Sequence, residues 1–264
     1  LAEKQGCILM EANKTAHCPA FNHLMVMIKS GLIGEVVDVE ASLSKLWDDK
    51  PMLREFDVEQ AGGSFYELGS YPLLPIIKLL GTDFKQLNFY SRMKNEVDMY
   101  TKGIMHYDKA VCTFKVGLGV KTEGNLVISG TKGYAYVPAP WWKTDFFELR
   151  YEDQNDNKKF FYKWDGAGLR YEIQEFISMI INNRRSSYKL RRRESIAIAE
   201  IITNFDFSHQ GDDILLVEKM SNEAITMVKN CIVSFIKKDS ELASSVIKRD
   251  TVVDKYFFMV KNAL

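Results

Sequence analysis

Several polar side chains that could take part in chemistry follow a short apolar run near the start of the chain. Residues 7–12 (CILMEA) form an apolar run of strand length, which predicts a strand buried on both faces. Asn13, Thr15 and His17 come directly after that strand. Because open α/β sheets bind ligands at the carboxyl ends of their strands, these three side chains are candidates for substrate binding. For His17, a packed or solvated imidazole is the alternative interpretation.

Two further patterns raise the question of phosphate or metal binding. Gly117 and Gly119 form a GxG pair, but Thr122 stands where a dinucleotide loop has its third glycine. The pair also lies within a predicted strand, which favours a bend or a close backbone contact. Asp250 and Asp254 lie on one face of a predicted helix and are weak candidates for metal ligands. Two carboxylates are few for a tight site, and basic neighbours favour a solvated acidic pair. The four cysteines form no CxxC spacing, so neither a zinc site nor a disulfide framework is indicated.

The overall composition excludes some classes of partner. The 264 residues contain 35 basic and 35 acidic side chains, so no global field attracts nucleic acid or an anionic membrane. No apolar stretch approaches the roughly 20 residues of a membrane span, and no signal peptide is visible. The sequence therefore predicts a cytoplasmic protein without nucleic-acid or membrane partners.

The elements that must position the polar residues follow from periodicity. Pro19 begins a predicted helix. In residues 35–46 apolar and polar residues alternate, which predicts a strand with one solvent-exposed face. Residues 60–81 predict a helix after a double glycine, residues 84–164 predict a run of strands, and residues 169–182 and 192–204 predict two more helices. Residues 205–217 predict a linker, and residues 218–264 predict a helical hairpin. The fold class is therefore α+β, with a large, mostly antiparallel sheet covered by helices on one face.

Five ordered blocks within residues 1–204 carry a resemblance to a known family. They are MEANKTAHCPAF, IKSGLIGEV, AGGSFYELGSYPLLPIIKLLG, GTKGYAYVPAPWW and GLRYEIQEFISMI. They resemble the glucose–fructose oxidoreductase/inositol dehydrogenase/MocA (Gfo/Idh/MocA) family. The resemblance implies a Rossmann domain that holds NAD or NADP, followed by a sheet domain that binds substrate and forms homo-oligomers through its open sheet face. Residues 1–16 would be the last strand of the first domain, and residues 17–204 the second.

The same resemblance implies what the sequence lacks. The glycine-rich dinucleotide loop of the family, and its Glu-Lys-Pro segment with a proton-transfer lysine, would lie before Leu1. The chain is therefore expected to be a truncated form that is inactive alone and binds NAD or NADP weakly or not at all. Its cofactor-binding residues are unknown.

The resemblance also assigns the proton-transfer chemistry that accompanies hydride transfer to or from a sugar carbon. The family has an Asp-x-Gly-x-His/Tyr motif, which here is Glu67–Tyr71. Tyr71 is accordingly the expected proton donor or acceptor. A phenol has a pKa near 10 and needs a neighbouring cation, for which Lys14 is a partial replacement. Glu67 either orients a substrate hydroxyl or caps the helix start.

Two residues before the double glycine complete the expected site. The resemblance places Arg54 and Asp57 where family members approach the substrate, and a surface ion pair is the alternative. The implied substrate is a sugar, sugar nucleotide or related polyol, with the sugar and the choice of NAD or NADP left open. A non-enzymatic oligomerisation or regulatory module is the alternative function.

The tail resembles a different family. Residues 218–264 resemble part of a PhoU-type phosphate-transport regulator, whose acid-x-x-x-acid motif is matched by Asp250 and Asp254. Nothing in the residues links sugar oxidation to this tail, so a natural fusion, a fragment and a joined reading frame remain alternatives. The two tail helices are expected to pack antiparallel and to make few contacts with the sheet domain.

Overall fold

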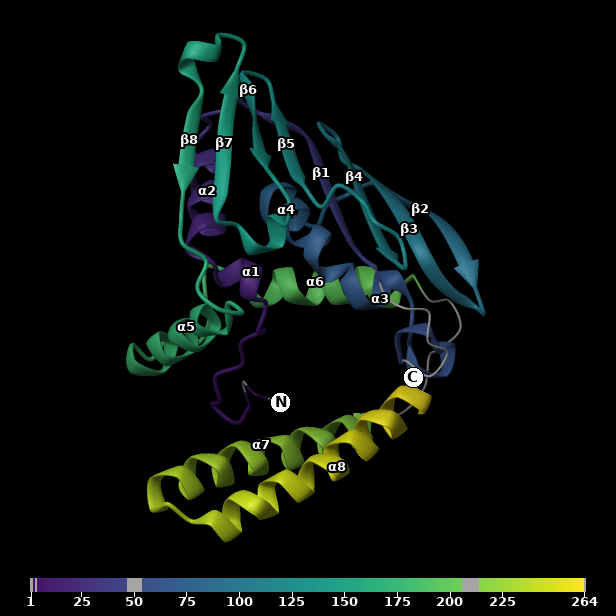
Figure 1. The fold of residues 1–264 in the computed structure, drawn as a ribbon, viewed down its shortest axis with the longest axis vertical. Helices are drawn as coiled ribbons and strands as arrows, with labels where there is room; N and C mark the ends of the chain where they lie inside the picture. The colour runs from purple at the N-terminus through teal and green to yellow at the C-terminus, as the bar shows by residue number, and fades with distance from the viewer. Residues whose placement is uncertain (1, 3, 47–53, 206–213, 264) are drawn as a thin grey trace.

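A computed structural model describes residues 2, 4–46, 54–205 and 214–263, and its central feature is one eight-stranded sheet (Figure 1). The strand order is β2-β3-β4-β1-β5-β6-β7-β8. The strands are β1 (Val36–Lys45), β2 (Gln86–Lys94), β3 (Val97–His106), β4 (Val111–Leu118), β5 (Leu126–Gly130), β6 (Gly133–Val137), β7 (Phe146–Tyr151) and β8 (Lys158–Phe161). Neighbouring strands are antiparallel except β1 and β4, which run parallel. The α+β class and the mostly antiparallel sheet are therefore confirmed.

Helices cover one face of this sheet (Figure 1). The helices are α1 (Lys14–His17), α2 (Pro19–Lys29), α3 (Ser64–Leu68), α4 (Ser70–Leu80), α5 (Leu169–Ile181), α6 (Arg192–Thr203), α7 (Ile214–Lys237) and α8 (Ser240–Ala263), with short 3₁₀ turns η1 (Arg54–Phe56), η2 (Val58–Gln60), η3 (Trp141–Lys143) and η4 (Gln154–Asp156). Strand residues facing the helices, such as Leu43, Phe114 and Leu149, are fully buried. Their neighbours along each strand point to the open face, which period-two alternation requires.

Two expected elements differ from the structure. Residues 7–12 are not a strand, and Leu9 is 63% exposed. A strand buried on both faces needs hydrogen-bonded neighbours, and no other described strand lies beside this segment. The helix expected over 60–81 is two helices, α3 and α4, that meet at Gly69. A Cβ at Gly69 would lie 2.5 Å from the Phe65 carbonyl oxygen, so the close approach at this junction requires glycine.

The tail forms the expected helical hairpin, with α7 and α8 packed antiparallel (Figure 1). Its first helix begins at Ile214, inside the segment expected to be a linker. Contact between the hairpin and the remaining chain includes α8 against η2. Within the described part of the chain, no helix is long and apolar enough to cross a membrane.

Candidate functional site

Three of the predicted substrate-binding residues lie at α1, and two of them hold that short helix in place. The Asn13 side chain accepts a hydrogen bond from the Ala16 backbone N–H at 3.2 Å and caps the helix. The Thr15 hydroxyl donates to the Trp142 carbonyl at 2.7 Å, which ties α1 to η3. Both side chains are buried. The Asn13 amide N–H groups and the lone pairs of the Thr15 hydroxyl are not used by these two bonds.

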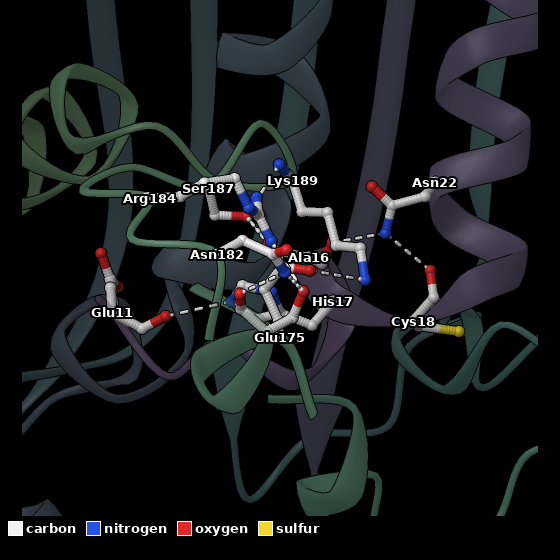
Figure 2. A network of polar contacts seen from close by, with 11 residues as sticks. Glu11, Ala16, His17, Cys18, Asn22, Glu175, Asn182, Arg184, Ser187 and Lys189 are labelled. Carbon is white, nitrogen blue, oxygen red and sulfur yellow. Dashed lines mark hydrogen bonds and ion pairs between the residues drawn. The ribbon is translucent and has the colours of Figure 1, made fainter. Parts of the chain in front are cut away.

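His17 is fully buried, in the network that Figure 2 shows. Its Nε2 lies 3.2 Å from the Glu11 carbonyl oxygen, whereas its Nδ1 has no hydrogen-bond partner among the described residues. A carbonyl can only accept, so Nε2 carries the proton and Nδ1 is a bare acceptor. Burial lowers the pKa of His17, and the Glu11 carbonyl offsets part of this effect. The imidazole is therefore a packed, neutral group, the alternative that the sequence left open.

The rest of this network ties α5 to the segment that follows it (Figure 2). Glu175 is buried and accepts bonds from Arg184 Nη1 at 3.2 Å and from the Ser187 hydroxyl at 2.9 Å. Lys189 Nζ lies 3.1 Å from its second oxygen. Burial alone would raise the pKa of Glu175, but the bonds from Lys189 and Ser187 outweigh it and lower that pKa. This charged cluster positions α5 next to α1.

Tyr71, the predicted proton carrier, lies in the first turn of α4 and is half-buried. Burial raises the pKa of its phenol, and the nearby Glu172 carboxylate raises it further. Glu172 is itself buried on α5, and burial raises its pKa while Lys14 partly opposes this. Glu172 on α5 thus interacts electrostatically with Tyr71 on α4 and with Lys14 on α1, against which α5 packs.

This arrangement differs from the expected one in a specific way. Lys14 acts on Glu172, and Glu172 rather than Lys14 is the charged neighbour that shifts the pKa of Tyr71. Glu172 was not among the site residues expected from the sequence. No local pattern marked it, because its proximity to Tyr71 depends on how α5 packs.

Glu67 and Arg54 form an ion pair that joins α3 to η1. Their side chains are 18% and 35% exposed, so the pair lies at the surface of the fold. Asp57 is used locally, since its carboxylate accepts from the Glu59 N–H at 3.0 Å and from Gln60 Nε2 at 2.8 Å. Arg54 therefore pairs with Glu67 and not with Asp57, and the substrate-binding role expected for Arg54 and Asp57 stays a prediction.

The double glycine before α3 is explained by Asp98, which sequence reasoning missed. Gly63 has φ +121°, and a Cβ there would lie 2.2 Å from Asp98 Oδ1. The other oxygen of Asp98 accepts bonds from the Ser64 hydroxyl at 2.6 Å, the Thr101 hydroxyl at 2.6 Å and the Phe65 N–H at 2.9 Å. Burial raises the pKa of Asp98, and these three donors partly offset it. The carboxylate therefore fixes the start of the helix that carries Glu67.

The two metal candidates in the tail, Asp250 and Asp254, are exposed on α8. In the described part of the chain, no group of three or more His, Cys, Asp or Glu side chains is arranged to hold a metal ion.

Comparison with known proteins matches both parts of the chain. Residues 21–136 match the family model of the GFO/IDH/MocA C-terminal domain, and residues 217–264 match that of the PhoU domain. Trans-1,2-dihydrobenzene-1,2-diol dehydrogenase of Oryctolagus cuniculus is 27% identical over 210 residues, covering 76% of this chain and 63% of that protein. The same enzyme of Sus scrofa is 26% identical, with 76% and 62% covered.

Solved structures show the same fold. Levoglucosan dehydrogenase in complex with NADH and levoglucosan has a TM-score of 0.63 at 15% identity, covering 75% of this chain and 63% of that one. The 3-ketoreductase KijD10 of Actinomadura kijaniata, in complex with NADP and TDP-benzene, has a TM-score of 0.62 at 17% identity, with 76% and 62% covered. The chain spans less than two thirds of the length of each of these four relatives. The resemblance inferred from the sequence is confirmed: the sheet part of the chain is similar to the Gfo/Idh/MocA oxidoreductases, and its tail is similar to the PhoU family.

Proposed function

We propose that residues 17–204 form the substrate-binding part of an NAD(P)-dependent oxidoreductase that acts on a sugar, sugar nucleotide or related polyol. Residues 1–16 would belong to its cofactor domain, and the PhoU-like hairpin would be a separate unit. The observation that carries the proposal is the electrostatic interaction of Glu172 with Tyr71, in the family-like motif, and with Lys14. A phenol beside a carboxylate is suited to proton transfer.

The electrostatics favour one direction of proton transfer. Burial and the Glu172 carboxylate both raise the pKa of Tyr71, so its phenol stays protonated at neutral pH. A neutral phenol donates its proton, so Tyr71 is set to protonate the oxygen of a carbonyl as it is reduced. Lys14 stabilises the ionised form of Glu172 and thereby helps to maintain this bias.

The described residues do not by themselves form a dinucleotide site. A pyrophosphate site needs a glycine-rich loop between a strand and a helix. Gly117 instead lies within β4, and Gly119, directly after the strand, donates its N–H to the Lys45 carbonyl at 2.8 Å. The cofactor of the proposed reaction would therefore be held by another part of the complete protein.

Two measurements test this proposal. Isothermal titration of the chain with NADH and with NADPH should show binding weaker than micromolar, and tight binding would contradict the assignment of the cofactor site elsewhere. A chimera that adds the part of the rabbit dehydrogenase outside the matched region should reduce sugar-type carbonyls. In that chimera Tyr71→Phe should lower turnover by about 10²-fold, whereas the exposed control Tyr90→Phe should not. An unchanged rate in Tyr71→Phe would remove Tyr71 from the mechanism.

A second candidate function, an association module, is favoured by the orientation of α5. This helix buries Glu172 and Glu175 and exposes apolar side chains on its other face, among them Ile173 at 57% and Ile177 at 49%. An exposed apolar face on a helix with buried carboxylates is typical of a surface that binds another protein surface. Large apolar side chains on α7 are likewise exposed, among them Ile225, Val228, Ile232 and Phe235.

The open sheet face was the surface expected to mediate homo-oligomers, and that remains a prediction. Its described strands present a mixture of charged and apolar groups, and Tyr90, Val111 and Phe161 are among its exposed large apolar side chains. Sedimentation velocity should therefore compare Ile173→Glu/Ile177→Glu with Tyr90→Glu/Phe161→Glu. The double variant that dissociates an oligomer identifies its interface. A strictly monomeric wild type would contradict the proposal of an association module.

A further inference from the structure

A cleft of about 740 Å³ lies at the ends of β2, β3 and β4, beside the loop of residues 119–123. This volume falls within the roughly 300–1,000 Å³ that small-molecule sites occupy. In Figure 1, β2 and β3 lie at the right-hand edge of the sheet, whereas α1 and α5, which carry Lys14 and Glu172, lie to the left. The cleft is therefore separate from the Tyr71 group.

The charge of the cleft is strongly positive. Arg92, Lys94, Lys115 and Lys121 line it, with Glu123 as the single carboxylate of its lining. Lys115 Nζ lies 2.8 Å from Glu123 Oε2, and its hydrogen bond lowers the pKa of that carboxyl. The side chains of Arg92 and Lys121 have no hydrogen-bond or ion-pair partner among the described residues. Because Lys115 is paired with Glu123, the cations that favour an anionic ligand are above all Arg92 and Lys121.

An aromatic ring forms part of the same lining. Tyr100 lies directly across from Arg92 on one side and from Gly117 on the other. A Cβ at residue 117 would lie 2.3 Å from Val120 Cγ1, which is an overlap, and 3.1 Å from Tyr100 Cδ2, which is a tight contact with the ring. The Gly117 position is thus explained by a close side-chain contact.

The strand geometry adds to this lining. The pairing of β2 with β3 shifts after Arg92, so that Met99 is the extra residue of a bulge. Successive residues of a regular strand point to opposite faces, but at a bulge this alternation is interrupted. Met99 and Tyr100 consequently line the same cleft.

We propose that this cleft binds a nucleoside diphosphate, with its phosphates on Arg92 and Lys121 and its ring system on Tyr100. Cationic side chains beside an aromatic ring suit such a ligand, because the phosphates need charge and the base needs a flat surface for stacking. Phosphate alone would leave Tyr100 and most of the volume unused. The proposal does not depend on the oxidoreductase function, since it concerns binding at a different place.

Isothermal titration of the 264-residue chain with ADP, pyrophosphate and adenosine, at about 50 mM salt, tests the proposal. ADP should bind more tightly than either of its two parts. Arg92→Ala/Lys121→Ala should weaken ADP at least about tenfold, which is about 1.4 kcal/mol. The matched control Lys132→Ala/Lys158→Ala removes the same charge from exposed residues that do not line the cleft, and should change the affinity less than about twofold.

Tyr100→Ala tests the stacking part. It should weaken ADP and adenosine but leave pyrophosphate unchanged. The proposal is overturned if ADP does not bind at millimolar concentration, or if both double variants lose affinity equally. It is also overturned if ADP and pyrophosphate bind equally well and Tyr100→Ala affects neither, because a bare phosphate site would then suffice.

Discussion

The Asp98 carboxylate offers the sharpest test of how the candidate site is held in place. It is 2% exposed and accepts bonds from the Ser64 and Thr101 hydroxyls and from the Phe65 N–H. Ser64 and Thr101 have second partners, the Val116 carbonyl at 3.5 Å and the Ser91 hydroxyl at 2.8 Å. Asp98→Ala therefore leaves only the Phe65 N–H without an acceptor.

The expected loss of stability follows from this count. A buried donor without an acceptor costs about 1–3 kcal/mol, and each hydrogen bond to a charged group contributes about 1.5–3 kcal/mol. With partial re-pairing of the two hydroxyls, Asp98→Ala should lower the free energy of unfolding by about 3–5 kcal/mol. Asp98→Asn keeps the shape and one accepting oxygen, so its loss should be about 1–2 kcal/mol.

Urea unfolding followed by tryptophan fluorescence measures these differences, because Trp141 is buried in the sheet domain. The matched control is Asp108→Ala, since the Asp108 side chain is 76% exposed and, in the part of the chain that the structure describes, pairs with Lys85 alone, at 3.3 Å. It should change the free energy of unfolding by less than about 0.5 kcal/mol. If Asp98→Ala also cost less than about 1 kcal/mol, the carboxylate would not anchor α3 and the reasoning would be refuted.

Three further predictions concern other parts of the chain. Glu172→Gln should lower the pKa of Tyr71, because it removes the carboxylate that destabilises the phenolate. Ultraviolet titration measures this shift, and the same titration of Tyr71→Phe identifies the part of the signal that belongs to Tyr71. Burial lowers the pKa of His17 below 6.5, so the unfolded chain binds more protons than the folded one on acidification. The contribution of His17 to the free energy of unfolding should therefore be fully present above about pH 6.5 and be lost as the pH falls below that value. The loss should be smaller in His17→Gln than in the wild type, and as large as in the wild type in the exposed control His106→Gln. Deletion of residues 210–264 should leave the melting of the sheet domain nearly unchanged, and a loss above about 2 kcal/mol would show that the hairpin is part of that domain.

Local patterns predicted most of the elements because the rules behind them are local. Period-two alternation over 84–164 identified the strands from β2 to β8, and Pro19 and Gly81 marked a helix start and a helix end. The expected strand at 7–12 was wrong, since an apolar run becomes a strand only where neighbouring strands accept its hydrogen bonds. Gly69 also interrupts the helix expected over 60–81, a break that depends on contact with Phe65.

The candidate site was predictable only where a motif marked it. Tyr71, Glu67 and Arg54 were found from the resemblance, and their roles remain predictions. Glu172 and Asp98 were missed, because an isolated acidic residue in a helix or strand has no distinctive spacing. Their significance depends on where the fold places α5, which brings Glu172 within electrostatic range of Tyr71, and on β3 packing against α3.

The sequence by itself determined the α+β class, the order of the elements and the family resemblance, since these depend on periodicity and ordered motifs. Tertiary structure decided which charges meet: Lys14 with Glu172, Glu67 with Arg54, and the cationic side chains around Tyr100. Electrostatic interactions fall off with distance and depend on burial, and both quantities are set by the packing of segments far apart in the chain. The chemistry of this protein therefore lies in contacts that no local pattern encodes.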